Sequence, residues 1–196
     1  MANNGVNMAY FKKMVGKKCY LAPCSKDDAE QWTKWNNDLE VAIPLGDEAY
    51  SPYPVERTRN DLDQIEKEPS HVFNIVDLKT DKLIGRCLLF SVHQIDRTAT
   101  FGIGIGEKDY WNKGYGQEAT ELILDYGFNL LNLHNIMLMV YGYNKRGLAC
   151  YRKVGFKEIG RRRQARIIGG KAYDVILMDI LADEFESPVV KKLVEQ

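Results

Sequence analysis

The chain has 196 residues, 45% of them hydrophobic and 28% charged, and its 27 Lys and Arg residues balance 27 Asp and Glu residues. This length and composition predict one soluble globular domain rather than a disordered or fibrous chain. The balance of charge removes the bulk attraction on which nucleic-acid and membrane-surface partners depend, so we expect neither partner. The sequence has no apolar run of membrane-spanning length and its start lacks a signal-peptide core, which together predict a cytoplasmic protein.

The spacing of cysteine and histidine predicts neither a metal site nor disulfides. The four cysteines have no paired C-x-x-C spacing, so we expect reduced thiols. The three histidines are scattered along the chain and form no ligand cluster. These residues are Cys19, Cys24, Cys87, Cys150, His71, His93 and His134.

The first predicted strand and helix lie near the start of the chain. The apolar stretch Cys19–Leu21 predicts a strand. Ser25 followed by Lys-Asp-Asp has the capping chemistry of a helix N-terminus, and Trp32 and Trp35 fall on the apolar side of that helix. Residues 37–70 mix helical segments with loops rich in Pro and Gly.

Strands dominate the middle of the chain and are followed by a long helix. The residue pattern predicts a β-hairpin formed by His71–Asp77 and Leu83–Ile95, followed by a third strand at Ala99–Gly106. Apolar residues at i, i+3, i+4, i+7 and i+11 then predict a helix over Gly116–Leu131 with one face packed on the sheet.

The last third of the chain alternates strand and helix. Asn135–Tyr143 is a strand of the buried type, Lys145–Phe156 is a short helix ended by Gly155, and Lys171–Leu181 is a last strand after a glycine turn. The order of all these elements predicts a mixed α/β or α+β sheet in a single domain.

We place this domain over residues 15–183. Residues 1–14 are expected to form a disordered N-terminal tail, and residues 184–196 a C-terminal tail.

One face of the strand Ala99–Gly106 carries no side chains. Side chains alternate across a strand, so Gly102, Gly104 and Gly106 share one face while the intervening isoleucines face the other way. Glycine at such positions marks the close approach of a backbone or a ligand. A tightly packed helix would explain the bare face, but we favour an extended ligand lying along the strand.

The stretch WNKGYGQEA opens the long helix. Its Gly114, Gly116 and Ala119 match the G-x-G-x-x-G/A fingerprint, and free amides at a helix N-terminus form an anion site. The segment EKDYWNK separates these glycines from the preceding strand, and the next strand ends without a ribose-binding carboxylate, which excludes a dinucleotide site. A Walker A loop is excluded because Gln117 and Glu118 stand where it needs Lys and a hydroxyl residue.

From Thr98 to Leu181 the chain resembles the GNAT superfamily of acetyl-CoA-dependent N-acetyltransferases, especially the branch of ribosomal-protein N-terminal and spermidine acetyltransferases. The matching stretches are FGIGIGEKDYWNKGYGQEATELILDYGFNLLNLHNI, YNKRGLACYRKVGF and GGKAYDVILMDIL. The resemblance implies a central mixed, mostly antiparallel sheet of about seven strands flanked by about four helices. It also implies acetyl-CoA as the cosubstrate and no metal.

The resemblance further implies which residues bind acetyl-CoA. The pantetheine arm would lie along the glycine-rich strand, the pyrophosphate on the amides of the loop before the long helix, and Asn144 would hydrogen-bond the cofactor. Trp111 stands where the family commonly has Gln or Arg, but main-chain binding does not depend on that side chain. The expected cofactor-binding residues are Ile103, Gly104, Ile105, Trp111, Asn112, Lys113, Gly114, Tyr115, Gly116, Gln117, Asn144 and Arg146.

Tyr151 stands where the family carries a tyrosine general acid. A phenol with a pKa of about 10 is protonated at neutral pH and would protonate the departing CoA thiolate. Without the resemblance, ordinary packing would be the simpler interpretation. The oxyanion donor would be a backbone N–H on the Ile105 strand. No general base is assigned: Glu107 and His93 are candidates by position, each more simply structural, and many relatives accept deprotonation through water.

The sequence does not identify the acceptor amine. Residues 37–68 hold nine acidic side chains against three basic ones, which would attract a cationic polyamine, an aminoglycoside or a lysine-rich peptide, unless they form an ordinary solvated helix face. We favour acetyl transfer to a polyamine such as spermidine or to a peptide or ribosomal-protein N-terminal amine. An amino acid or aminoglycoside acceptor, a non-catalytic acetyl-CoA-binding regulatory module and a homodimer stay open.

Overall fold

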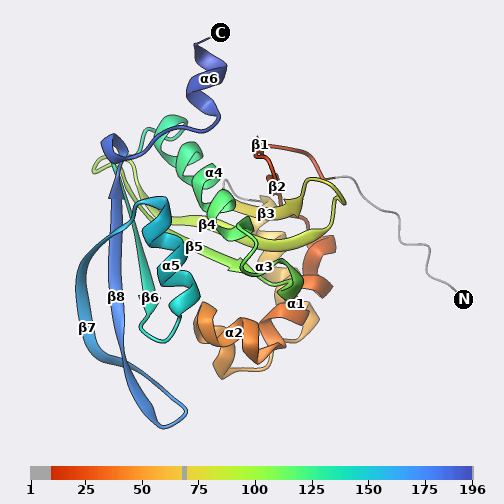
Figure 1. Cartoon of the computed structure of the whole chain (residues 1–196). Coiled ribbons are helices and arrows are strands. Elements are labelled where there is room, and N and C mark those ends of the chain that lie inside the picture. Colours follow the sequence, from red (N-terminus) through yellow and green to blue (C-terminus); the bar gives the residue numbers. More distant parts are fainter. Residues whose placement is uncertain (1–9, 68–69, 196) are drawn as a thin grey trace, which may run out of the picture.

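A computed structural model describes residues 10–67 and 70–195, which fold around one eight-stranded sheet (Figure 1). Residues 1–9 of the expected N-terminal tail lie outside the described residues. The strand order is β1-β2-β3-β4-β5-β6-β8-β7, and all neighbours in it are antiparallel except β5 and β6. The strands are β1 Met14–Val15, β2 Cys19–Pro23, β3 His71–Asp77, β4 Leu83–His93, β5 Thr98–Ile105, β6 Asn135–Tyr141, β7 Lys157–Ile168 and β8 Lys171–Leu181.

Helices cover both faces of this sheet. The α-helices are α1 Ala29–Asn37, α2 Leu39–Leu45, α3 Val55–Lys67, α4 Tyr115–Asn129, α5 Lys145–Val154 and α6 Val190–Val194. Along β2, Tyr20 and Ala22 pack in one hydrophobic cluster with α1 and α3, whereas Cys19 and Leu21 pack in another with α4 and α5. Because neighbouring side chains of a strand point to opposite faces, the sheet lies between two helical layers.

The predicted capping residues start a single 3-10 turn, Lys26–Asp28, which leads directly into α1. The Ser25 hydroxyl accepts a hydrogen bond from the Asp27 amide at 3.3 Å, and the Asp28 carboxylate accepts one from the Ser25 amide at 2.8 Å. Trp32 and Trp35 are 5% and 3% exposed, so the apolar side of α1 is buried as expected.

The observed class is the expected mixed, mostly antiparallel sheet, with two differences in detail. The sheet gains an eighth strand because the short β1 pairs with β2 through Met14↔Leu21 and Val15↔Tyr20. Two residues are too few to produce a period-two signal. Six α-helices are described instead of about four, since residues 37–70 contain both α2 and α3 and the end of the chain adds α6.

The start of the described chain is packed against the domain. Tyr10 lies within the segment expected to be a disordered tail, yet its hydroxyl donates to the Asp28 carboxylate at 2.6 Å. The Lys13 amide donates to the Leu21 carbonyl at 2.8 Å, which extends the pairing of β1 with β2.

The end of the chain is tied to α4. The Asp125 carboxylate is fully buried and accepts hydrogen bonds from the Ser187 hydroxyl at 2.6 Å and from the amides of Val189 and Val190 at 2.8 and 3.0 Å. Residues 187–190, within the segment expected to be a C-terminal tail, are therefore joined to the core of the molecule where α6 begins.

Strands β5 and β6 separate in the middle of the sheet. They pair in parallel only over residues 98–100 and 135–137. Beyond this point β5 stays with β4 as far as Ile105, and β6 stays with β8 as far as Tyr141. The two inner edges are left with unpaired backbone groups, which need a partner such as water or a ligand.

In the described part of the chain, no helix combines the length and the apolar character that a membrane span needs. The same residues contain no group of three or more His, Cys, Asp or Glu side chains placed to hold a metal ion.

Candidate active site

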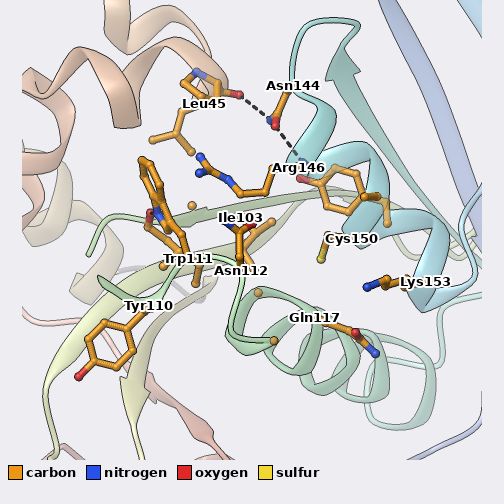
Figure 2. A pocket seen from close by; sticks show the side chains of 18 of the residues that line it. Leu45, Ile103, Tyr110, Trp111, Asn112, Gln117, Asn144, Arg146, Cys150 and Lys153 are labelled. Carbon is orange, nitrogen blue, oxygen red and sulfur yellow. Dashed lines mark hydrogen bonds between the residues drawn. The ribbon is translucent and has the colours of Figure 1, made fainter. Parts of the chain in front are cut away.

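A pocket of about 300 Å³ lies where β5 and β6 separate (Figure 2). Its walls come from α2, the end of β5, the loop before α4, and α5. Of the thirteen predicted site residues, the eleven that line it are Ile103, Gly104, Ile105, Trp111, Asn112, Gly114, Gly116, Gln117, Asn144, Arg146 and Tyr151. The remaining two do not line the pocket: Lys113 belongs to the loop before α4, and Tyr115 is the first residue of α4, whose hydroxyl donates to Asp77 at 2.8 Å.

Sequence reasoning missed eight lining residues. They are Val41, Pro44, Leu45, Tyr110, Gly147, Ala149, Cys150 and Lys153. The lining residues on α5 could have been found from helical spacing. Cys150 and Tyr151 follow Gly147 at i+3 and i+4, so these three residues share one face of the helix. The lining residues on α2 had no such signal, because only the packing of the chain brings this helix to β5.

The backbone of β5 presents hydrogen-bonding groups to the pocket. The Gly106 amide donates to Ile84 of β4 at 2.9 Å, so the amide and carbonyl of Ile105 point away from β4, by the alternation of a strand. The Trp111 indole confirms this direction, since its Nε1 donates to the Ile105 carbonyl at 2.7 Å. The backbone groups of Ile103 face the same way, past the last residues that pair with β6.

The glycine face of β5 is covered by helices α1 and α2 and not by a ligand, which corrects our expectation. A Cβ on Gly104 would lie 2.5 Å from Leu45 Cδ2. A Cβ on Gly106 would lie 2.1 Å from the Trp35 ring. The bare face therefore makes room for two large side chains, and Leu45 in turn forms one wall of the pocket.

The loop before α4 presents backbone amides that no acceptor of the described residues occupies. Gly114 caps the helix with φ of 86°, and Asn112 also has a positive φ of 58°. The Trp111 amide is already bonded to the Lys108 carbonyl at 3.0 Å, so the series of free amides starts one residue later than expected. Within the described residues, the amides of residues 112–117 have no acceptor, and they point out of the positive end of the α4 dipole.

Trp111 and Arg146 form one wall of the pocket together. The Arg146 guanidinium stacks over the Trp111 ring at 3.6 Å, and the indole is held by its bond to β5. Burial lowers the pKa of Arg146, although arginine remains a cation at neutral pH. In Figure 2 these two side chains lie beside Ile103 and Leu45.

Asn144 caps α5 as well as lining the pocket. Its Oδ1 accepts from the Gly147 amide at 2.9 Å, and its Nδ2 lies 3.5 Å from the Pro44 carbonyl of α2 (Figure 2). The oxygen is therefore occupied by the cap, and the amide nitrogen is the group left for a ligand.

Tyr151 lies at the end of the pocket with its ring fixed by two aromatic neighbours. It is 9% exposed and packs edge-on against Phe101 and Phe156, with ring centroids 6.2 and 5.9 Å away. Burial, and secondarily the neighbouring Cys150, raises the pKa of the phenol above its usual range. Among the described residues no side chain or carbonyl hydrogen-bonds to its hydroxyl, which leaves the proton available to a ligand.

Neither candidate base lies in the pocket. Glu107 accepts hydrogen bonds from Gln31 and Trp35 at 2.8 and 3.0 Å and pairs with Lys82. Burial alone would raise the pKa of this carboxyl, but the bonds to Lys82 and Trp35 outweigh it and lower the pKa. His93 pairs with Asp96 at 3.0 Å in an exposed turn. Both residues have a structural explanation.

Six acids of the segment predicted to attract a cation form ion pairs, which offset part of its negative charge. Glu48 and Asp47 pair with Arg86 and Arg166 at 3.2 and 3.1 Å, and Lys108 bridges two more acids of the same region. The two acids that Lys108 bridges are Asp38 and Glu40, and the further paired acids, Glu56 and Asp63, have partners within the segment. The partners of the six acids thus come partly from β4, β7 and the loop after β5, which the sequence could not pair with them.

Comparisons with known proteins agree in fold and family. A model of the GNAT acetyltransferase domain matches residues 18–157. The chain is 30% identical over 113 residues to an uncharacterized N-acetyltransferase, p20, of Bacillus licheniformis, covering 58% of this chain and 63% of that protein. It is 28% identical over 165 residues to the spermidine N(1)-acetyltransferase of Escherichia coli K12, covering 84% and 87%. The solved structure of spermidine N-acetyltransferase from Vibrio cholerae in complex with CoA and spermine superposes with a TM-score of 0.77 at 26% identity, covering 86% and 98%.

Proposed function

Because the chain belongs to the GNAT family of acetyl-CoA-dependent N-acetyltransferases, we propose that its pocket between β5 and α5 binds acetyl-CoA and that Tyr151 is the general acid of acetyl transfer to a primary amine. The observation that carries this proposal is the convergence on one pocket of a free strand edge, a row of free amides and a buried phenol. These three features come from β5, the loop before α4, and α5.

The pocket offers groups that match the pantetheine arm and the diphosphate of acetyl-CoA in chemistry. The inner edge of β5 offers the amide and carbonyl of Ile103 to the amide groups of the pantetheine arm. The amides of residues 112–117 and the positive end of α4 suit the diphosphate. When bound, acetyl-CoA supplies a thioester carbonyl activated toward an amine.

Tyr151 is suited to give up a proton to the sulfur that leaves. Its raised pKa keeps the hydroxyl protonated at neutral pH, and its aromatic neighbours hold the ring in one orientation. Because neither Glu107 nor His93 lines the pocket, we propose that the acceptor amine loses its proton to water.

We place polyamines such as spermidine and peptide N-terminal amines first among the acceptors. Relatives described as spermidine acetyltransferases support the polyamine. Asp47 and Glu48 form ion pairs, which weakens the argument that their charge attracts a polycation. On electrostatic grounds a singly charged peptide N-terminus or an amino acid is equally suitable as the acceptor.

An acceptor screen tests the proposed reaction. Polyamines, N-terminal peptides, amino acids and aminoglycosides are each incubated with acetyl-CoA and the protein while free thiol is measured. We expect thiol release above the rate of hydrolysis with at least one primary amine. Calorimetric binding of acetyl-CoA without turnover of any amine would instead support a regulatory module, and absence of binding would contradict the assignment of the pocket.

A further inference from the structure

The Tyr151 end of the pocket lies at the level of Phe101 on β5. The Tyr151 ring packs edge-on against Phe101 with the ring centroids 6.2 Å apart, and the pocket is lined by Ile103 of the same strand. Strand β5 pairs with β6 only as far as Thr100, so its inner edge is free from the next residue onward. An amine that attacks a thioester beside Tyr151 must therefore reach this part of the gap between β5 and β6.

The face of the sheet that α2 covers is open to solvent at this level. Helix α2 lies over Gly104, where a Cβ would meet Leu45 at 2.5 Å. At Gly102 the nearest atoms to such a Cβ belong instead to Leu88 and Phe90 of β4, at 3.0 and 3.8 Å. Because Phe90 is 42% exposed, the gap opens to solvent beside Gly102.

Strand β6 contributes Met139 to the same face. Thr100 pairs in parallel with Met137, and Met139 follows two residues later, so all three side chains point to the face that α2 covers. Leu138 and Val140 point the other way and belong to the core beneath α4 and α5. Met139 is 53% exposed. The opening therefore lies between a phenyl ring of β4 and a thioether of β6, both of which are exposed.

The charges around this opening do not favour a polycation. Asp47 and Glu48, which follow α2, pair with arginines at 3.1 and 3.2 Å. Asp179, which lies beside Met137 on β8, accepts a hydrogen bond from the Asn135 side chain at 2.8 Å. A second ammonium group of the acceptor would find these three carboxylates already bonded, whereas an apolar group would find exposed apolar surface to cover.

We propose that the acceptor carries a large apolar group next to its primary amine and that Phe90 and Met139 bind this group. The N-terminus of a peptide that begins with leucine or methionine has this chemistry. The inference rests on the proposed function of the pocket and selects among the acceptors considered for it. Covering the two exposed side chains removes apolar surface from water, which stabilises the complex with such an acceptor.

A series of peptides tests the preference. The peptides share one sequence and differ only in their first residue, which is leucine, methionine or serine, and spermidine serves as the polycation. Free thiol is measured at saturating acetyl-CoA. We expect the leucine and methionine peptides to react with a kcat/KM at least about tenfold above that of the serine peptide and of spermidine.

Two variants show whether the opening is responsible. Met139→Gln makes the side chain polar at nearly constant length, and Leu130→Gln is the matched control, because Leu130 is 50% exposed at the end of α4. Met139→Gln should raise the KM of the leucine peptide about fivefold and leave its kcat and the KM of the serine peptide within about twofold. Leu130→Gln should change none of these values. Calorimetry with CoA should give both variants the affinity of wild type.

Equal kcat/KM for the leucine and serine peptides, or a preference for spermidine, would overturn the inference. A loss in Met139→Gln that is the same for both peptides would also overturn it, because a merely structural effect does not depend on the first residue of the peptide. In each of these cases turnover of an amine leaves the proposed function in place. Absence of thiol release with every amine would overturn the proposed function and the inference together.

Discussion

Tyr151 lines the pocket, and its hydroxyl has no hydrogen-bond partner among the described residues. Burial raises the pKa of this phenol, so it stays protonated throughout the neutral range, although the same shift makes it a weaker acid. Because Phe101 and Phe156 pack against the ring edges, removing the hydroxyl leaves the packing of the ring intact.

We therefore expect Tyr151→Phe to lower kcat by about 100-fold, the usual contribution of a general acid, while the KM for acetyl-CoA changes little. Steady-state kinetics with the acceptor found in the screen measure this. Tyr126→Phe is the matched control, since its hydroxyl bonds to His71 outside the pocket. Wild-type turnover by Tyr151→Phe would rule out the acid role.

Gly106 is a second single position that decides packing, because it carries no side chain. Trp35 occupies the space where a Cβ would lie, and its indole also donates to Glu107. The ring is therefore held from two sides and has little freedom to yield.

Gly106→Ala should destabilise the protein by at least about 2 kcal/mol, because the new methyl group meets the Trp35 ring. Gly160→Ala provides the comparison, as its Cβ would lie 3.9 Å from Leu177, an ordinary contact. Urea unfolding of both variants measures the difference. Equal stability of the two would show that α1 can move away from β5 at little cost.

Helix α2 forms the wall of the pocket opposite α5. Three side chains hold the carbonyls at its C-terminal end, which a helix leaves without partners. Tyr143 and Arg166 donate to the carbonyls of Ile43 and Gly46 at 2.9 and 2.6 Å, and Asn144 reaches Pro44 more weakly. The wall therefore depends for its position on the connection between β6 and α5 and on β7.

Arg166→Met should loosen this wall. The substitution keeps an apolar side chain between the rings of Tyr50 and Tyr141 but leaves the Gly46 carbonyl without its donor, at a cost of about 2 kcal/mol. We expect faster hydrogen exchange in α2 and about fivefold higher KM for the acceptor than for wild type. Arg162→Met, at an exposed position of the same strand, should change neither quantity; protection of α2 equal to wild type in Arg166→Met would contradict the role of this contact.

At the scale of the whole molecule, the end of the chain closes the core beside α4. The buried Asp125 carboxylate receives the donors of residues 187–190, and Val190 is 7% exposed. A buried carboxylate without these donors would be costly.

A chain ending at Asp183 should therefore lose about 3 kcal/mol of unfolding free energy. A chain ending at Val190 is the control, because it keeps all three donors to Asp125 and should lose far less. Thermal unfolding of both truncations measures this. A similar midpoint for the two would show that the contacts to Asp125 contribute little.

The parts of the fold that the sequence predicted well are those that depend on near neighbours. Ser25 caps the turn before α1, Gly155 ends α5 with a left-handed φ of 114°, and Gly114 starts α4. Each signal acts over a few residues, so no knowledge of the packing is needed. The two-residue β1 and the short α6 gave no such signal, since pairing and burial with distant segments create them.

What the sequence alone determined about this protein is its family, its class of fold and the loop and helix that supply free amides and a phenol. The tertiary structure decided which edge of β5 faces the pocket, because the space beside two of its glycines is filled by Trp35 and Leu45. It also decided that six acids of residues 37–68 form ion pairs, four of them with cations from outside that segment. The physical reason is range: capping and turn preferences act between near neighbours, whereas these contacts join segments far apart in the chain, which only the packing of the whole molecule brings together.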